Sequence, residues 1–285
     1  MKRITLLLAA TIITAGSVSA QVFKRQRHEL SLHAGGGFST LQYDLQTGKH
    51  ANGIGLNAGG GYTYFLLPRL GVRTGLEISQ YRSSATLSDF SESYDVKGAT
   101  TADNYTFSYT LAKYQETQQS LYLNIPLMLQ VQTGRKYIMY AAFGGKACFP
   151  IKATAKTKKY DLATKGYFPT EGRTYDDLPQ YGFGTYEYLK RKTGLDNLKL
   201  HYMASAELGL KWKVLEKNDL YTGLYADYGL NNIQSVNDKT FVKNTLVADK
   251  PAMSPLIESR VAGVPETEMI RPLAIGLKLR FTFMR

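Results

Sequence analysis

The sequence predicts an all-β fold: an eight-stranded antiparallel up-and-down transmembrane β-barrel, with ten strands as the alternative. Three observations predict it. Eight segments carry apolar residues at every second position, which is the period of a strand with two different faces. The connections between them are alternately short and long, as in barrels with short periplasmic turns and long extracellular loops. The N-terminus has the pattern of an export signal.

The export signal occupies the first twenty residues. Lys2 and Arg3 form a charged start, an apolar run follows, and small residues precede Gln21, as in a cleavable secretory peptide. We therefore predict a signal peptide over residues 1–20 and a single barrel domain over residues 21–285. A secreted soluble β protein is the alternative.

The composition fits an exported, β-rich chain. The 285 residues carry a formal net charge of +12 and include 26 glycines, 21 tyrosines and one cysteine. Cys148 cannot form an intrachain disulfide, so a disulfide scaffold is excluded. No stretch after the signal approaches the roughly 20 apolar residues of a transmembrane helix. Strands are therefore expected to cross the membrane.

The first four expected strands alternate clearly. They run over Glu29 to Ser39, Gly53 to Leu66, Leu70 to Tyr81 and Ser120 to Gln132. Their apolar positions are Leu30, Leu32, Ala34 and Phe38; Ile54, Leu56, Ala58, Tyr62 and Tyr64; Leu70, Val72, Leu76 and Ile78; and Leu121, Leu123, Ile125, Leu127, Leu129 and Val131. Each segment has the 9–11 residues that a tilted membrane strand needs.

The last four expected strands run over Tyr137 to Phe149, Leu200 to Val214, Leu220 to about Leu230 and Pro272 to Phe283. The first of them is ambiguous, because Ile138 and Tyr140 compete with Met139 and Phe143 for the outer face. The other three are regular, with apolar positions at Leu200, Tyr202, Ala204, Ala206, Leu208, Leu210, Trp212 and Val214; Leu220, Leu224, Ala226, Tyr228 and Leu230; and Leu273, Ile275, Leu277, Leu279, Phe281 and Phe283.

The connections place both termini at one rim. Short turns are expected at residues 67–69, 133–136 and 215–219, and long loops at residues 40–52, 82–119, 150–199 and 231–268. The short turns belong on the periplasmic side. A hairpin within Tyr181 to Leu189 is the reason that ten strands remain open.

One short motif carries a family resemblance. The segment Tyr122-Leu123-Asn124-Ile125-Pro126-Leu127 resembles the "YLxIPL" element of the Bacteroidetes outer-membrane β-barrel family called PorT-like or OmpA-like. The closing strand is similar too. The resemblance implies an outer-membrane barrel, recognised by the barrel-assembly machinery during insertion. Because proline lacks an N–H, we expect a bulge at Pro126 or an unpaired position near a rim.

Charged residues alternate with the apolar ones and should point into the barrel. They are Arg73, Glu77, Glu207, Lys211, Asp227, Lys278 and Arg280. Eight strands enclose a space that side chains just fill, and buried charges must pair or stay hydrated. We expect a lumen filled by a salt-bridge network; a narrow gated channel is the alternative.

The third long loop is strongly basic. Its clustered cations are Lys156, Lys158, Lys159, Lys190, Arg191 and Lys192. Basic surfaces bind polyanions, and for an exported chain the nearest polyanion is lipopolysaccharide rather than nucleic acid. The loop is therefore a predicted polyanion-binding site; a solvated loop that only keeps the surface basic is the alternative.

Motifs for catalysis, cofactors and metals are weak. His28 and His33 miss the H-E-x-x-H spacing by one residue, and Gly53 to Ala58 matches G-x-G-x-x-A inside a strand, whereas that motif needs a strand before it and a helix after it. We expect no catalytic, cofactor or metal site and no enzyme. A hydrolase built on His33 or His201 is the weaker alternative.

The sequence thus predicts a monomeric outer-membrane barrel with a structural or interaction role through its extracellular loops. Outer-membrane lipid, including lipopolysaccharide, is its expected surrounding. The alternative is a narrow channel, or an accessory subunit of a secretion or nutrient-uptake machine.

Overall fold

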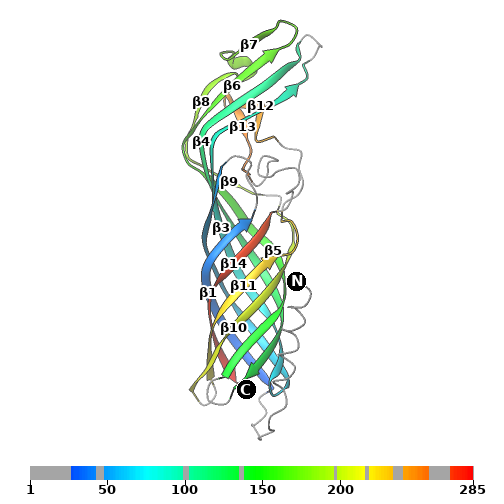
Figure 1. Ribbon diagram of the computed structural model, residues 1–285, viewed down its shortest axis with the longest axis vertical. Coiled ribbons are helices and arrows are strands. Elements are labelled where there is room, and N and C mark those ends of the chain that lie inside the picture. The colour runs from blue at the N-terminus through cyan, green and yellow to red at the C-terminus, as the bar shows by residue number, and fades with distance from the viewer. Residues whose placement is uncertain are drawn as a thin grey trace, which may run out of the picture.

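Eight strands close a ring in the computed structural model (Figure 1). They are β1 (His28–Gln42), β2 (Lys49–Leu67), β3 (Leu70–Val96), β4 (Tyr105–Thr133), β5 (Ile138–Thr157), β10 (His201–Leu215), β11 (Asn218–Gly229) and β14 (Arg271–Met284). Each pairs antiparallel with the next, and β14 pairs with β1. The predicted eight-stranded up-and-down barrel is therefore confirmed.

The structure describes residues 27–42, 48–98, 103–134, 138–195, 198–215, 218–233, 240–256 and 270–284. The predicted signal peptide and its cleavage point lie outside these ranges. Among the described residues, no helix has the length and apolar character needed to cross a membrane.

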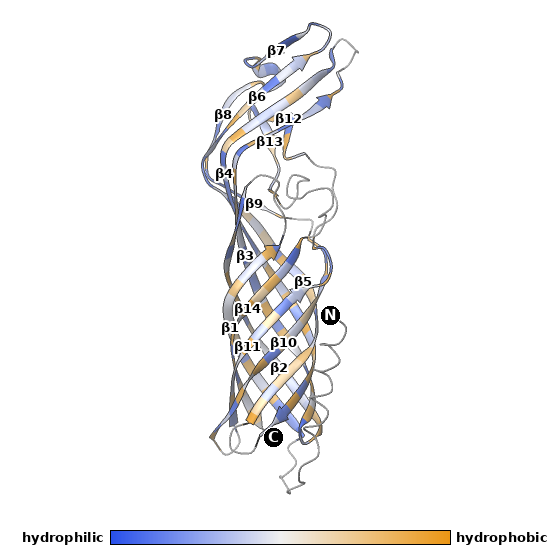
Figure 2. Cartoon of the chain, in the orientation of Figure 1, coloured by the Kyte–Doolittle hydropathy of each residue, from blue (hydrophilic) through white to orange (hydrophobic). Residues whose placement is uncertain are grey.

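The outer wall of the barrel is apolar. Ile54, Leu127 and Leu277 expose 70, 64 and 66 % of their surface, and hydrophobic residues recur along the barrel strands in Figure 2. A large exposed apolar surface marks an interface or a membrane. In β5 the outward residues are Met139 and Phe143, while Tyr140 is buried inside, which resolves the ambiguity of that strand.

Close backbone contacts between strands require glycine. A Cβ on Gly37 of β1 would lie 2.4 Å from the Cα of Gly276 in β14. These two residues face each other in the pair of strands that closes the barrel. A side chain on either one would push the first and last strands apart.

Pro126 lies on the inner face of β4, opposite Lys146 of β5. The pairing of β4 with β3 stops at Leu127, opposite Thr74, and resumes at Asn124 in the same register. The proline has no N–H to donate to this ladder. The prediction of a bulge at Pro126, or of an unpaired position near a rim, was wrong: the interruption lies within the barrel wall and adds no residue.

The second long loop is not a loop. Pairing of β3 with β4 continues from the barrel up to Val96 and Tyr105. The predicted connection over residues 82–119 was therefore wrong. Its outward positions carry hydroxyl groups instead of apolar side chains, and these pair across the strands, as Ser91 Oγ and Thr110 Oγ1 do at 2.8 Å.

Shorter elements surround this extension. They are β6 (Tyr160–Phe168), β7 (Arg173–Tyr175), the 3₁₀ helix η2 (Pro179–Tyr181), β8 (Gly184–Tyr188), β9 (Arg191–Gly194), β12 (Val242–Val247) and β13 (Lys250–Met253). Strand β6 pairs with β4, β7 and β8 pair with β6, β9 pairs with β5, and β12 pairs with β13. Because β8 stays outside the ring, the ten-strand alternative was wrong.

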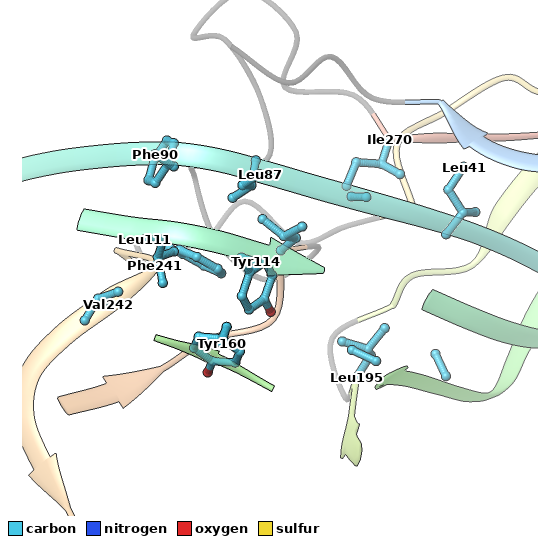
Figure 3. Close-up of a cluster of buried hydrophobic side chains, with 14 of the residues drawn as sticks. Leu41, Leu87, Phe90, Leu111, Tyr114, Tyr160, Leu195, Phe241, Val242 and Ile270 are labelled. Carbon is cyan, nitrogen blue, oxygen red and sulfur yellow. The ribbon is translucent and has the colours of Figure 1, made fainter. Parts of the chain in front are cut away.

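We call residues 83–96, 105–118, 152–195 and 240–256 the head. It leans away from the barrel at the end opposite the C-terminus (Figure 1). The hydrophobic core runs from the head into the upper barrel, where it includes Tyr81, Tyr122 and Met203. In the head, distant segments contribute Leu87, Phe90, Phe107, Leu111, Tyr114, Tyr160, Leu162, Phe183, Phe241 and Val242 to this core. Figure 3 shows part of it, around Leu87, Tyr114 and Phe241. Buried Glu116 ties these segments together, because its carboxylate accepts the Leu256 N–H at 3.2 Å.

Candidate functional site

The seven predicted lumen residues all lie inside the barrel. Six are buried, and the Lys211 side chain is 8 % exposed. They come from β3, β10, β11 and β14, where alternate residues point to opposite faces of the sheet. The strands that turn leucines toward the outside therefore turn these charges inward.

Glu77 is the centre of the network. Its Oε1 accepts a hydrogen bond from Lys146 Nζ at 2.8 Å, and its Oε2 accepts one from Lys278 Nζ at 2.9 Å. His33 Nε2 lies 3.0 Å from Oε2, and Ser79 Oγ donates to Oε1 at 3.0 Å. The buried carboxylate is thus surrounded by cations and donors, as a buried charge requires.

The two lysines extend the network across the barrel. Lys146 also donates to Asp227 at 2.8 Å, and Lys278 donates to Glu207 at 3.0 Å. Arg73 Nη2 lies 2.7 Å from Glu207 Oε1. A continuous chain of ion pairs therefore joins β11, β5, β3, β14 and β10 through the lumen.

A second group of charged lumen residues lies nearer the short turns. Lys211 Nζ is 2.7 Å from Glu29 Oε1 and 2.7 Å from Asp219 Oδ2, the latter an ion pair without hydrogen-bond geometry. Tyr221 donates its hydroxyl to Glu29 at 2.9 Å. The Arg280 guanidinium lies 4.0 Å from the centre of the Tyr221 ring and donates to Gln130 at 2.8 Å.

The charges of this lumen balance. The carboxylates are Glu29, Glu77, Glu207, Asp219 and Asp227, and the cations are Arg73, Lys146, Lys211, Lys278 and Arg280. Five negative and five positive charges sum to zero, with His33 left out. A buried charge without a partner is costly, so a balanced set is the arrangement that an interior of this kind can hold.

Little free space remains beside the network. A cavity lined by Glu77, Glu207, Lys278 and Pro126 has a volume of about 10 Å³, which is space for about one water molecule. Toward the head, Tyr81 donates its hydroxyl to Met203 Sδ at 3.3 Å. Charged groups joined by ion pairs therefore lie in the lower lumen, and packed side chains lie above them.

Sequence reasoning missed three of the ten charged residues of the network, namely Lys146, Glu29 and Asp219. Lys146 lies in the strand whose faces were ambiguous, and Glu29 and Asp219 lie near strand ends. His33 was considered only as a catalytic residue, whereas its imidazole contacts Glu77. His201 is buried, and its ring packs edge-on against Tyr122 with ring centres 4.5 Å apart.

The six predicted polyanion-binding residues are all exposed in the head. Lys156 of β5 faces Lys192 of β9, and Arg191 faces Thr157. The remaining three lie in the turns next to these strands. Lys159 forms an exposed ion pair with Glu187 at 2.7 Å, and this hydrogen bond raises the pKa of the lysine. The structure thus brings Lys156 and Lys192 to one face of the β5–β9 pair, whereas Arg191, the next residue along β9, points to the other face.

No cluster of three or more His, Cys, Asp or Glu side chains that could hold a metal ion occurs within the described ranges. Cys148 is buried below the head.

Comparisons with known proteins address the family. Among solved structures, the chain is similar to the outer membrane protein OprG from Pseudomonas aeruginosa, with 11 % identity over 89 % of this chain and 95 % of that chain and a TM-score of 0.30. It is also similar to a Pseudomonas aeruginosa FadL homologue, with 9 % identity over 90 % of each chain and a TM-score of 0.22. Both scores are too low to support an argument.

The curated proteins include no match to this chain. The model of the outer membrane protein β-barrel domain matches residues 19–235, which is well over half of the sequence and includes seven of the eight barrel strands. The chain therefore belongs to the outer membrane protein β-barrel domain family.

Proposed function

We propose that this outer-membrane protein is a closed barrel that anchors its head outside the cell, where the head interacts with other components of the envelope. The observation that carries the proposal is the charge-balanced network joined through Glu77, which fills the lumen. A lumen of this kind serves as a rigid base rather than as a route for solute.

The head supports an interaction role. Its core is built from segments far apart in the sequence, as the contact of Phe90 with Phe241 illustrates. Segments packed against each other in this way hold one conformation and present one defined surface to a partner. A solvated loop would adopt many conformations, each with a different surface. A monomer suffices for this role, and the barrel-assembly machinery remains the expected partner during insertion.

We infer in addition that the chain is a PorT-like or OmpA-like member of its family. The support is the segment from Tyr122 to Leu127, together with Pro126 at the inner face of β4. This finer assignment favours a role within a larger envelope system.

The proposed role is not enzymatic. His33 and His201, the histidines that could serve a hydrolase, contact Glu77 and Tyr122 inside the barrel. Replacing either histidine by alanine should leave binding by the head intact.

A narrow gated channel is the second candidate function. One observation favours it: the lumen is filled by polar side chains that can exchange partners, and a water-sized cavity already lies beside Glu77 and Lys278. A channel of this type could serve a secretion or nutrient-uptake machine as an accessory subunit.

Conductance in planar bilayers separates the two candidates. The full-length protein, inserted in its folded form, should give no discrete current steps over a wide voltage range. Reproducible single-channel openings would contradict the closed barrel and support the channel.

The interaction role needs its own test. The wild-type protein and a variant in which residues 160–188 are replaced by a short glycine-serine linker would be purified from native membranes in mild detergent. A partner that co-purifies only with the wild type supports the proposal. Identical co-purifying proteins would contradict it.

A further inference from the structure

Four exposed cations form a strip on the outer face of the sheet. They are Arg82 of β3, Lys152 and Lys156 of β5, and Lys192 of β9. We call these residues the basic strip. Lys152, Lys156 and Lys192 lie within the predicted basic loop at residues 150–199, and Arg82 lies outside it.

The strand register brings the four side chains together. Arg82 faces Gln119, and Gln119 faces Thr154 on the next strand. One step higher, Lys156 faces Lys192. Alternate residues point to the same side of a sheet, and neighbouring strands are about 4.8 Å apart. The basic strip therefore extends over four strands, about 14 Å across the sheet, and over about 13 Å along β5 from Lys152 to Lys156.

The strip begins where the apolar wall ends. On β5, exposed Phe149 and Ile151 come directly before Lys152. On β3, exposed Ile78 precedes Arg82 by four residues, or about 13 Å along a strand. The headgroup layer of a membrane begins at the edge of its hydrocarbon core. With the apolar wall in the hydrocarbon core, these positions would bring the four cations to the level of the outer headgroups.

The charge of the strip is not neutralised by the protein. Within the described part of the chain, Arg82, Lys152, Lys156 and Lys192 form no ion pair. The outward residues between them are hydroxyl and amide side chains, including Gln119 and Thr117. By contrast, Lys159 higher in the head is paired with Glu187.

We propose that the basic strip binds the phosphate groups of lipopolysaccharide in the outer leaflet. Cations near a membrane surface attract anionic headgroups, and adjacent hydroxyl and amide groups can donate further hydrogen bonds to phosphate oxygens. The apolar wall directly below would contact the acyl chains of the same molecule. A soluble polyanion has no acyl chains that could contact the apolar wall. The combination of basic strip and apolar wall therefore favours a lipid as the ligand.

The test compares two variants of the full-length protein folded in detergent. The strip variant carries Arg82→Gln, Lys152→Gln, Lys156→Gln and Lys192→Gln. The control variant carries Lys97→Gln, Lys165→Gln, Arg173→Gln and Lys243→Gln, which removes four exposed cations that lie in the head or directly beside it. Heat-modifiable gel mobility confirms that both are folded, and binding of purified lipopolysaccharide is titrated at physiological salt.

The strip variant should bind lipopolysaccharide at least about tenfold more weakly than the wild type, because it lacks four cations that attract anionic headgroups near a membrane surface. The control variant should bind like the wild type. Equal binding by the strip variant and the wild type would overturn the proposal.

The source of the phosphate is tested with two further probes. Lipopolysaccharide from which the phosphates have been removed should bind the wild type much more weakly; unchanged binding would overturn the proposal. Inorganic phosphate at millimolar concentration should not displace the lipid, and full displacement would overturn the lipid assignment. None of these outcomes depends on conductance or on partners of the head.

Discussion

At the scale of single residues, Glu77 is the point at which the ion pairs of the lumen meet. Its carboxylate binds two lysines that each bind a second carboxylate. The inward position of Glu77 follows from strand alternation alone, so the sequence predicts it. Its partner Lys146 does not follow, because the apolar residues around it fit either face of β5. The register between neighbouring strands decides which side chains meet across the lumen. That register cannot be deduced from the sequence of one strand alone.

Replacing Glu77 by glutamine should destabilise the barrel by about 3–5 kcal/mol, because Lys146 and Lys278 lose their shared carboxylate in a buried place. The loss is measured by urea unfolding of the protein in lipid vesicles. Glu187→Gln is the matched control, because its ion pair with Lys159 is exposed to solvent and exposed ion pairs add little to stability. Equal stability of the two variants would show that the network does not hold the lumen together.

At the scale of elements, the alternation of apolar residues predicts the eight membrane strands closely, from β1 to β14. It fails for the upper halves of β3 and β4. Above the membrane the outward face meets water, so serine and threonine replace leucine and the amphipathic signal disappears. Backbone pairing continues nevertheless, since hydroxyl side chains such as Ser84 and Thr117, 3.0 Å apart, suit a solvated strand.

Closure of β1 against β14 depends on small residues. Gly37→Ala should destabilise the barrel by about 1–3 kcal/mol, since the new methyl group would overlap the backbone of Gly276. Gly145→Ala serves as the control, because a Cβ there meets its nearest atom at an ordinary distance of 3.5 Å. Both are compared by the temperature at which gel mobility changes. If both variants lower this temperature equally, the close approach of β1 and β14 does not determine the stability of the barrel.

The head should unfold separately from the barrel. Phe183 is fully buried and contacts the rings of Tyr105 and Phe107. Phe183→Ala should therefore remove about 3–5 kcal/mol from the head alone, and limited proteolysis should cut the head faster while barrel mobility stays unchanged. Exposed Tyr167→Ala is the control. Loss of barrel mobility with Phe183→Ala would show instead that the head and the barrel unfold together.

At the scale of the whole molecule, the alternating short and long connections predict an even-stranded barrel with its turns at one rim, and the structure has this layout. The head could not be predicted. Its core joins β4, β6, β12 and the segment around Phe183, which are far apart in the sequence, and each contributes only a few apolar residues. A pattern read along one strand does not reveal such a core.

The central claim is that the lumen of this barrel is closed. Cys148 is the only cysteine of the chain. It lies on β5, two residues from Lys146 and opposite His201 of β10, and its side chain is buried. A small charged thiol reagent applied to the folded protein in lipid vesicles reports directly whether water reaches this part of the lumen. A Ser93→Cys variant in the Cys148→Ser background provides an exposed reference on β3. A closed lumen predicts that Cys148 is labelled only after unfolding; labelling of the folded barrel at the rate of the exposed reference would contradict it.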